Sequence, residues 1–431
     1  MLIQFRLQNH RSLRDEQTLS LVAATKDGAD HLLHPEGIEE SLLPALALYG
    51  ANASGKTNVL LALAFMRAAV AHSHRLWEPD SGVPQEAFAL SVHRVEPSIY
   101  EVDALVVGVR YRYGFSISAE RVEEEWLYAW PNGRKQLWFR RQGDTFEFGR
   151  NFQGENETIR GLTRPNSLFL SAGAQNNHPA LLPIFGWFRG LHFELRRARP
   201  FGFRAYGGAS PFLYSRMVEE LFSRQGSLFA EDDPLQNDRD AIVRLLQAAD
   251  TGIVDVRVER GSADEQRPKA PPRVSLYFKH KADDPENAWL PMEVESAGTV
   301  TLLELAMRLV PTLRTGGVLC VDEIESSLHP MLAGALLRLF CDRAHNPKGA
   351  QLIFTTHDTN LLGNVLGPSP LRRDQIWFTE KDQSGASHLY PLTDFNPRKE
   401  ENLERGYLQG RYGAVPFLGE LTSEPEPTTE S

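Results

Sequence analysis

The eight residues GANASGKT, at positions 50–57, constrain the fold more than any other part of the chain. They follow the apolar run ALALY at 45–49 and lead into a segment rich in Ala and Leu at 58–74. The apolar run is typical of a buried strand, and the Ala and Leu content favours a helix. A glycine-rich turn between a strand and a helix is the context in which this pattern forms a phosphate loop.

The residue types of this loop predict its chemistry. Its glycines allow backbone N–H groups to curl around a β-phosphate, and the lysine reaches the β and γ oxygens. The threonine hydroxyl ligates Mg²⁺ in such loops. The alternative is a chance match on a glycine-rich turn, which the flanking strand and helix disfavour. We expect ATP to be bound here by Gly50, Asn52, Gly55, Lys56, Thr57 and Asn58.

Two adjacent carboxylates follow a second apolar run, in GGVLCVDEIESSLHP. The apolar residues 318–321 predict a buried parallel strand, and open α/β sheets bind ligands at the carboxyl ends of their strands. Asp322 would hold Mg²⁺ through water, and Glu323 would orient or deprotonate the attacking water. The alternative is an acidic pair that merely caps a helix.

His357 ends the next predicted strand, in LIFTTHD, with one helix between it and Glu323. Alternating helices and strands predict a parallel sheet, and neighbouring parallel strands bring their carboxyl ends together. We therefore expect His357 to face the same γ-phosphate as Glu323 and to act as its sensor. The alternative is a structural histidine at a strand end.

Composition limits the class of protein. The chain has 431 residues, of which 42% are hydrophobic and 24% charged, as in an ordinary soluble protein. Its longest apolar runs are too short or too interrupted to span a bilayer, and the first residues lack a signal peptide, so we expect a cytoplasmic protein with no membrane partner. Cys320 and Cys341 are expected in the core. The net charge of -10 disfavours non-specific coating of nucleic acid.

The patterning predicts an α/β fold in several parts. Residues 101–149 alternate apolar and polar side chains, which indicates an antiparallel sheet, and NSLFLSAGAQ indicates another short strand. We expect an N-terminal lobe with the phosphate loop and an antiparallel meander at 1–183, a helical and loop insertion at 184–290, a C-terminal lobe at 291–420 and a disordered tail at 421–431.

Together these motifs resemble the ABC-type ATPase head found in SMC, RecF and OLD proteins. NHRSLRDE, RYRYGFSI, ESAGT, DEIESSLHP, TTHD and ENLERGYLQGRYGAVPF more closely resemble the bacterial stand-alone AAA/ABC-type ATPases of the RloA and abortive-infection kind. The resemblance covers residues 2–418. It implies a P-loop NTPase fold with a mixed sheet, an antiparallel β subdomain and a helical insertion.

By this resemblance ESAGT is the signature motif, which in the wider family reads Leu-Ser-Gly-Gly-Gln. It implies that Ser296, Gly298 and Thr299 contact the γ-phosphate bound to a second subunit, and hence a homodimer or higher oligomer. The alternative for Ser296 is an N-cap on a core helix. Gln175 resembles the glutamine that touches Mg²⁺ and water, and Arg11 the basic residue that contacts nucleotide phosphates. A polar loop residue and a solvated charge are the respective alternatives.

The resemblance implies an ATPase, converting ATP and water to ADP and phosphate, that works as a nucleotide-dependent dimerisation switch. Its expected setting is an anti-phage or abortive-infection system that controls a separate nuclease or toxin, because little chain follows the last predicted strand. The alternative is a RecF- or SMC-like DNA-binding repair ATPase. An arginine-rich stretch could line a nucleic-acid groove, or form an interface or a solvated face; it contains Arg189, Arg196, Arg197, Arg199 and Arg204.

Overall fold

The structure of the chain is a computed structural model. It describes residues 1–25, 29–91, 95–195, 218–219, 221–222, 234–249, 252–260, 274–284, 288–326, 328–363, 367, 369–398 and 401–416. The arginines at 196–204, Ser327 and the predicted tail at 421–431 lie outside these residues.

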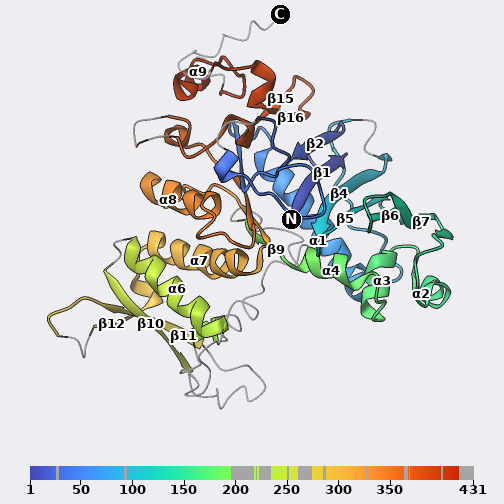
Figure 1. The fold of residues 1–431 in the computed structure, drawn as a ribbon, viewed down its shortest axis with the longest axis horizontal. Helices are drawn as coiled ribbons and strands as arrows, with labels where there is room; N and C mark the ends of the chain where they lie inside the picture. Colours follow the sequence, from blue (N-terminus) through green and yellow to red (C-terminus); the bar gives the residue numbers. More distant parts are fainter. Residues whose placement is uncertain are drawn as a thin grey trace, which may run out of the picture.

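A six-stranded sheet forms the centre of the molecule (Figure 1). Its five strands from β9 to β15 are parallel, and only the edge strand β16 is antiparallel. The inner strands are buried along their whole length, which explains their unbroken apolar runs and confirms the predicted parallel sheet. In spatial order the strands are β16 (Ser387–Pro391), β15 (Ile376–Lys381), β3 (Ala45–Gly50), β14 (Gln351–Thr355), β13 (Val318–Val321) and β9 (Leu191–Glu194).

Helices cover both faces of this sheet. Along β3, Leu46 and Leu48 pack in one core cluster with α1 (Lys56–Leu76), whereas Ala45 and Ala47 pack in another with α7 (Ala297–Thr315) and α8 (Pro330–Cys341). A buried strand that alternates between two apolar layers is typical of mixed α/β folds, and the predicted fold class is confirmed. Short 3-10 turns lie at Ala29–His31, Met292–Val294 (η3), Thr359–Leu361 (η4), Arg373–Gln375 and Leu392–Phe395.

A seven-stranded antiparallel sheet packs against α1, the helix that also covers the central sheet (Figure 1). The predicted meander is confirmed. Tyr100 and Phe115 from this sheet share a core cluster with Phe65 of α1. The order is β2 (Gln17–Ser20), β1 (Leu2–Gln8), β4 (Ser98–Val106), β5 (Val109–Ile117), β6 (Val122–Trp130), β7 (Gln136–Gln142) and β8 (Thr145–Phe148).

The strand predicted at NSLFLSAGAQ is wrong, because these residues form helix α3 (Phe169–Gln175). The fully buried Glu125 carboxylate accepts the backbone N–H groups of Phe169 and Leu170, at 2.6 and 3.0 Å. A carboxylate at a helix N-terminus satisfies N–H groups that have no partner within the helix. Two further helices, α2 (Asn156–Leu162) and α4 (Leu182–Arg189), flank α3.

The segment predicted as an insertion mixes helix and strand. Its first part supplies β9 to the central sheet. Its later part contains α6 (Pro234–Ala248) and a separate sheet of β10 (Ile253–Arg260), β11 (Val274–His280) and β12 (Trp289–Pro291). Helix α6 packs on α7, where Arg314 pairs with Asp238 at 2.8 Å. A last helix, α9, spans Leu403–Leu408. In the part of the chain that the structure describes, no helix has the length and apolar content needed to cross a membrane.

A buried histidine should make stability depend on pH. His10 is fully buried with Nδ1 2.9 Å from the Tyr100 hydroxyl, and burial lowers its pKa to about 3. An unfolded histidine titrates near 6.5, so below that pH the unfolded chain binds more protons than the folded chain. The free energy of unfolding should therefore fall as the pH drops from about 6.5 to about 3.

We expect His10→Gln, which keeps an oxygen to accept from Tyr100, to weaken this pH dependence in urea unfolding at pH 7 and pH 5. His345→Gln, at an exposed histidine, is the control. An unchanged dependence in His10→Gln would show that His10 does not contribute.

Candidate functional site

The phosphate loop joins β3 to α1 at the carboxyl edge of the central sheet. Gly50 and Gly55 have φ of 155° and 111°, in the region that favours glycine. A Cβ at Gly50 would lie 2.5 Å from the Thr379 carbonyl oxygen, and one at Gly55 would lie 2.4 Å from Ser387 Oγ. The loop is therefore pressed against β15 and β16 at both glycines.

Lys56 is buried at the start of α1, with 6% of its surface exposed. Its Nζ donates to the carbonyl oxygens of Gly50 and Ala51, at 2.7 and 3.0 Å. These bonds hold the ammonium group at the loop, where it can attract phosphate oxygens. Asn52 is exposed in the loop, whereas the Asn58 amide donates to Ser12 Oγ at 2.7 Å.

Asp322 joins the two halves of the site. It follows β13 and is 2% exposed, and its Oδ1 accepts the hydroxyls of Thr57 and Thr355, at 2.9 and 2.7 Å. Its Oδ2 is buried and has no hydrogen-bond partner among the residues that the structure describes. A buried carboxylate oxygen without a partner is costly unless a cation or water satisfies it.

The donor set fits Mg²⁺. No three His, Cys, Asp or Glu side chains in the described ranges converge as a metal site, so the protein offers a carboxylate and a hydroxyl rather than a full cage. Mg²⁺ prefers oxygen ligands and is usually held by one or two protein groups, waters and substrate phosphates. Thr57 and Asp322 would hold the ion, which when bound would neutralise charge on the phosphates.

The second carboxylate and the histidine follow neighbouring strands. Val321 of β13 pairs with Phe354 of β14, so Glu323 and His357 emerge from the same edge of the sheet. The N–H of Glu323, a residue with φ of 53°, donates to Thr355 Oγ1 at 2.7 Å. The exposed His357 donates its backbone N–H to Glu325 Oε1 at 2.6 Å.

The signature residues lie at the N-terminus of α7. The Ser296 side chain caps the helix by accepting from the N–H of Thr299 at 3.1 Å, and the two hydroxyls are 2.9 Å apart. Ser296 is exposed, Gly298 is half-buried and Thr299 is buried. The hydrogen bonds found for Ser296 and Thr299 are with this first turn, not with the phosphate loop of the same chain.

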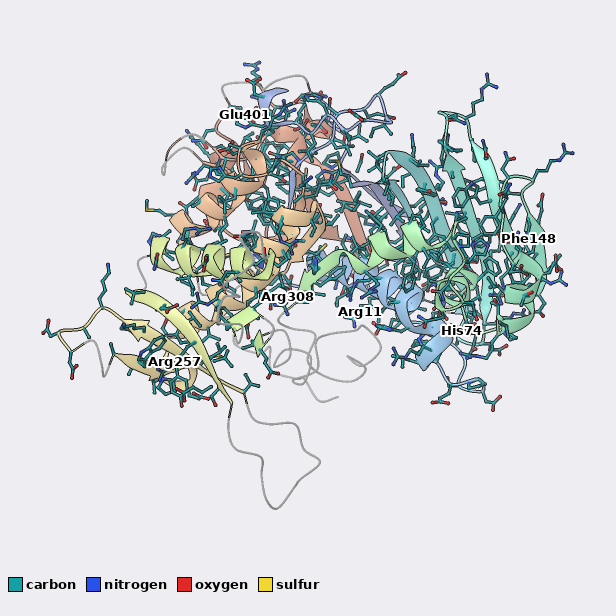
Figure 2. The ribbon with its side chains drawn as sticks, turned by 60° about the horizontal axis from the view of Figure 1, so that its bottom comes forward. Arg11, His74, Phe148, Arg257, Arg308 and Glu401 are labelled. Atoms are coloured by element: carbon teal, nitrogen blue, oxygen red, sulfur yellow. The ribbon has the colours of Figure 1, made fainter. Side chains whose placement is uncertain are left out.

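Two residues that were predicted to contact the nucleotide or its Mg²⁺, Gln175 and Arg11, make other contacts or lie elsewhere in the structure. Gln175 ends α3 and is exposed, and Ser171 of that helix accepts from the N–H of His74. His74 lies about 25 Å along α1 from Thr57 at 1.5 Å per residue, beside the antiparallel sheet (Figure 2). The structure therefore does not bring Gln175 into the site. Arg11 lies closer, one residue before Ser12, but its guanidinium pairs with Glu86.

The site also contains residues that the sequence analysis did not predict. Thr355 bonds both carboxylate-bearing residues, and its only sequence signal is its place in TTHD. Glu194, on the four-residue β9, accepts the Asp322 N–H with its backbone oxygen at 2.9 Å and pairs through its side chain with Arg308 of α7. Ser12 hydroxyl contacts Asn58 and Ser387. These contacts join distant segments, which no local pattern reveals.

Asp322→Asn tests the cation site. The neutral amide keeps the shape but removes the charge, so we expect the affinity for ATP measured with Mg²⁺ to fall by about tenfold or more, while the affinity in EDTA changes little. Calorimetry with and without Mg²⁺ measures both. Asp144→Asn, at an exposed hairpin, is the control. Equal losses with and without Mg²⁺ would argue against a cation at Asp322.

A family profile described as "AAA domain, putative AbiEii toxin, Type IV TA system" matches residues 46–363. None of the curated proteins matches the chain. Among solved structures, the SMC head domain from Thermotoga maritima is 13% identical, with a TM-score of 0.39 over 90% of this chain and 98% of that chain. The SMC head bound to the C-winged helix domain of ScpA is 14% identical, with a TM-score of 0.44 over 90% and 96%.

The matched range covers well over half of the chain. It begins inside β3 and ends after η4, so it includes the phosphate loop, the carboxylate pair and His357. The protein is therefore a member of this AAA domain family.

Proposed function

We propose that the protein binds and hydrolyses ATP between the phosphate loop and the carboxylate pair. The observation that carries the proposal is the Asp322 carboxylate, which accepts the Thr57 hydroxyl and keeps a second buried oxygen available for a cation. Lys56 and the loop N–H groups bind the phosphates, and Thr57 and Asp322 hold Mg²⁺. Membership of a P-loop family supports nucleotide binding at this place.

Glu323 is the proposed base. Its backbone N–H donates to Thr355, and its carboxylate follows the same strand as that of Asp322. It orients the attacking water and accepts its proton. His357, at the end of the adjacent strand, contacts the γ-phosphate, so its position reports whether ATP or ADP is bound.

A second copy of the chain completes the site in this proposal. Ser296 is exposed at the start of a 19-residue helix, where free N–H groups favour an anion. An exposed apolar side chain also lies next to this motif: Val294, two residues before Ser296, is 63% exposed. We propose that Ser296, Gly298 and Thr299 contact the γ-phosphate of a partner copy, so that ATP joins two subunits and hydrolysis releases them.

The biological output is proposed to be control of a separate nuclease or toxin in a defence system. The family description, which names a toxin and a type IV TA system, supports this setting. The alternative is a RecF- or SMC-like DNA-binding ATPase. Of the five arginines that suggested a nucleic-acid groove, Arg189 is exposed at the end of α4, and the other four lie outside the described residues.

Co-purification tests the setting. The protein would be purified with the products of its neighbouring genes, with and without ATP, and the co-eluting chains identified. A nuclease or toxin subunit that binds in a nucleotide-dependent way supports the proposal. Salt-sensitive, ATP-dependent binding of duplex DNA without such a subunit would favour the alternative.

Glu323→Gln tests the reaction. The amide cannot accept a proton but keeps the size of the side chain, so we expect ATP to bind normally while turnover falls by about a hundredfold or more. The variant should accumulate as a dimer with ATP, seen by light scattering, and remain monomeric without it. Glu157→Gln, on the exposed surface of α2, is the control. Undiminished hydrolysis by Glu323→Gln would exclude this residue as the base.

A further inference from the structure

The C-terminal motif ENLERGYLQGRYGAVPF has no role in the site described so far. Its residues 401–416 fold back over the central sheet, with α9 capped by Asn402, whose side chain accepts from the N–H of Arg405 at 2.9 Å. Tyr407 of α9 packs on Tyr49 of β3 and Phe378 of β15, with ring centroids 5.7 and 5.6 Å apart. Figure 1 shows α9 at the top of the view, above the central sheet, and Figure 2 labels Glu401 of the same segment.

One residue of α9 packs beside the phosphate loop. The Tyr407 ring lies against Tyr49, the residue that precedes Gly50, and its hydroxyl donates to the Ala414 carbonyl oxygen at 3.2 Å. The Gly50 carbonyl in turn accepts from Lys56 Nζ. Helix α9 therefore packs on the residue immediately before the loop that holds Lys56.

A second residue of α9, one turn earlier on the same face, contacts the loop that follows His357. Glu404 Oε1 accepts the Thr359 hydroxyl at 3.1 Å. A Cβ at Gly363 would lie 2.0 Å from Glu404 Oε2, so the carboxylate packs directly on that glycine. The neighbouring Asp358 carbonyl accepts the Tyr49 hydroxyl at 3.1 Å.

The sensor loop, residues 357–363, is thus fixed at both ends. Glu325 accepts the N–H of His357 at its start, and Glu404 holds Thr359 and Gly363 at its end. The same helix that holds the end of the sensor loop also packs, through Tyr407, on Tyr49, which directly precedes the phosphate loop.

We propose that α9 is a positioning element for ATP hydrolysis, in which Glu404 and Tyr407 set the place of His357 relative to the phosphate loop. This inference rests on the proposed ATPase function and deepens it. Neither residue contacts the nucleotide; both act through the loops that do. A small displacement of a group that contacts the transferred phosphate lowers the rate strongly, while binding of the nucleotide by Lys56 and the loop N–H groups is preserved.

A purely structural role for α9 predicts a different result. Leu403 and Tyr407 belong to the core, so their loss would destabilise the fold and reduce binding and turnover together. The half-buried Glu404 separates the two cases, because its side chain makes a polar contact with the sensor loop rather than filling the core.

The experiment compares Glu404→Ala and Thr359→Val, which each remove the hydrogen bond, with Glu404→Gln and Thr359→Ser, which keep it. For the first two we expect kcat to fall by about tenfold, with KM and the Kd for ATP within about twofold of the unsubstituted chain. The two conservative variants should keep kcat close to that of the unsubstituted chain. Arg405→Ala, on the exposed side of α9, is the matched control.

Combining Glu404→Ala with Thr359→Val should lower kcat no further than either change alone, since both break one contact. Unchanged kcat in both single variants, or equal losses of ATP affinity and kcat, would overturn the positioning role. Thr359→Val provides the test if Glu404→Ala does not fold. Absence of hydrolysis by the unsubstituted chain would instead contradict the proposed function itself.

Discussion

The rest of the site depends on the hydrogen bonds that the Asp322 carboxylate accepts. One oxygen accepts hydroxyls from the start of α1 and the end of β14, so a single buried charge ties three segments that are far apart in sequence. Burying a carboxylate is costly, and two hydroxyl bonds compensate only part of that cost. The second oxygen is buried without a partner in the described chain, and this is the observation behind the proposed cation site.

Further contacts connect this carboxylate to more distant parts of the chain. Its own N–H donates to the Glu194 backbone, and the Glu194 side chain pairs with Arg308 on α7, the helix that begins at Ser296. On the other side, Thr355 leads through His357 to a loop held by α9. The phosphate loop, the start of α7 and the C-terminal segment are thus joined by polar contacts, most of them partly buried, as well as by the apolar core.

Local sequence patterns were sufficient to predict the helices, strands and loop that carry the site. The phosphate loop, β13, β14 and the meander each have a periodicity or a motif that tertiary contacts do not override. The predicted strand at 167–171 was wrong because Glu125, distant in sequence, stabilises the N-terminus of α3. Gln175, which ends this helix, lies away from the phosphate loop. Strand β9 is too short for a periodic signal, and the contacts of Ser12, Thr355 and α9 depend on which segments the fold brings together.

In the proposed dimer, the Ser296 hydroxyl that caps α7 also faces a phosphate on a second subunit. Mixing Lys56→Ala chains with Ser296→Arg chains decides this. Each variant alone should be inactive. In an equal mixture about half of the dimers should be mixed, and each mixed dimer should contain one intact shared site out of two, giving about a quarter of the unsubstituted activity. Full activity of Ser296→Arg alone, or no recovery when mixed dimers form, would contradict a site shared between two subunits.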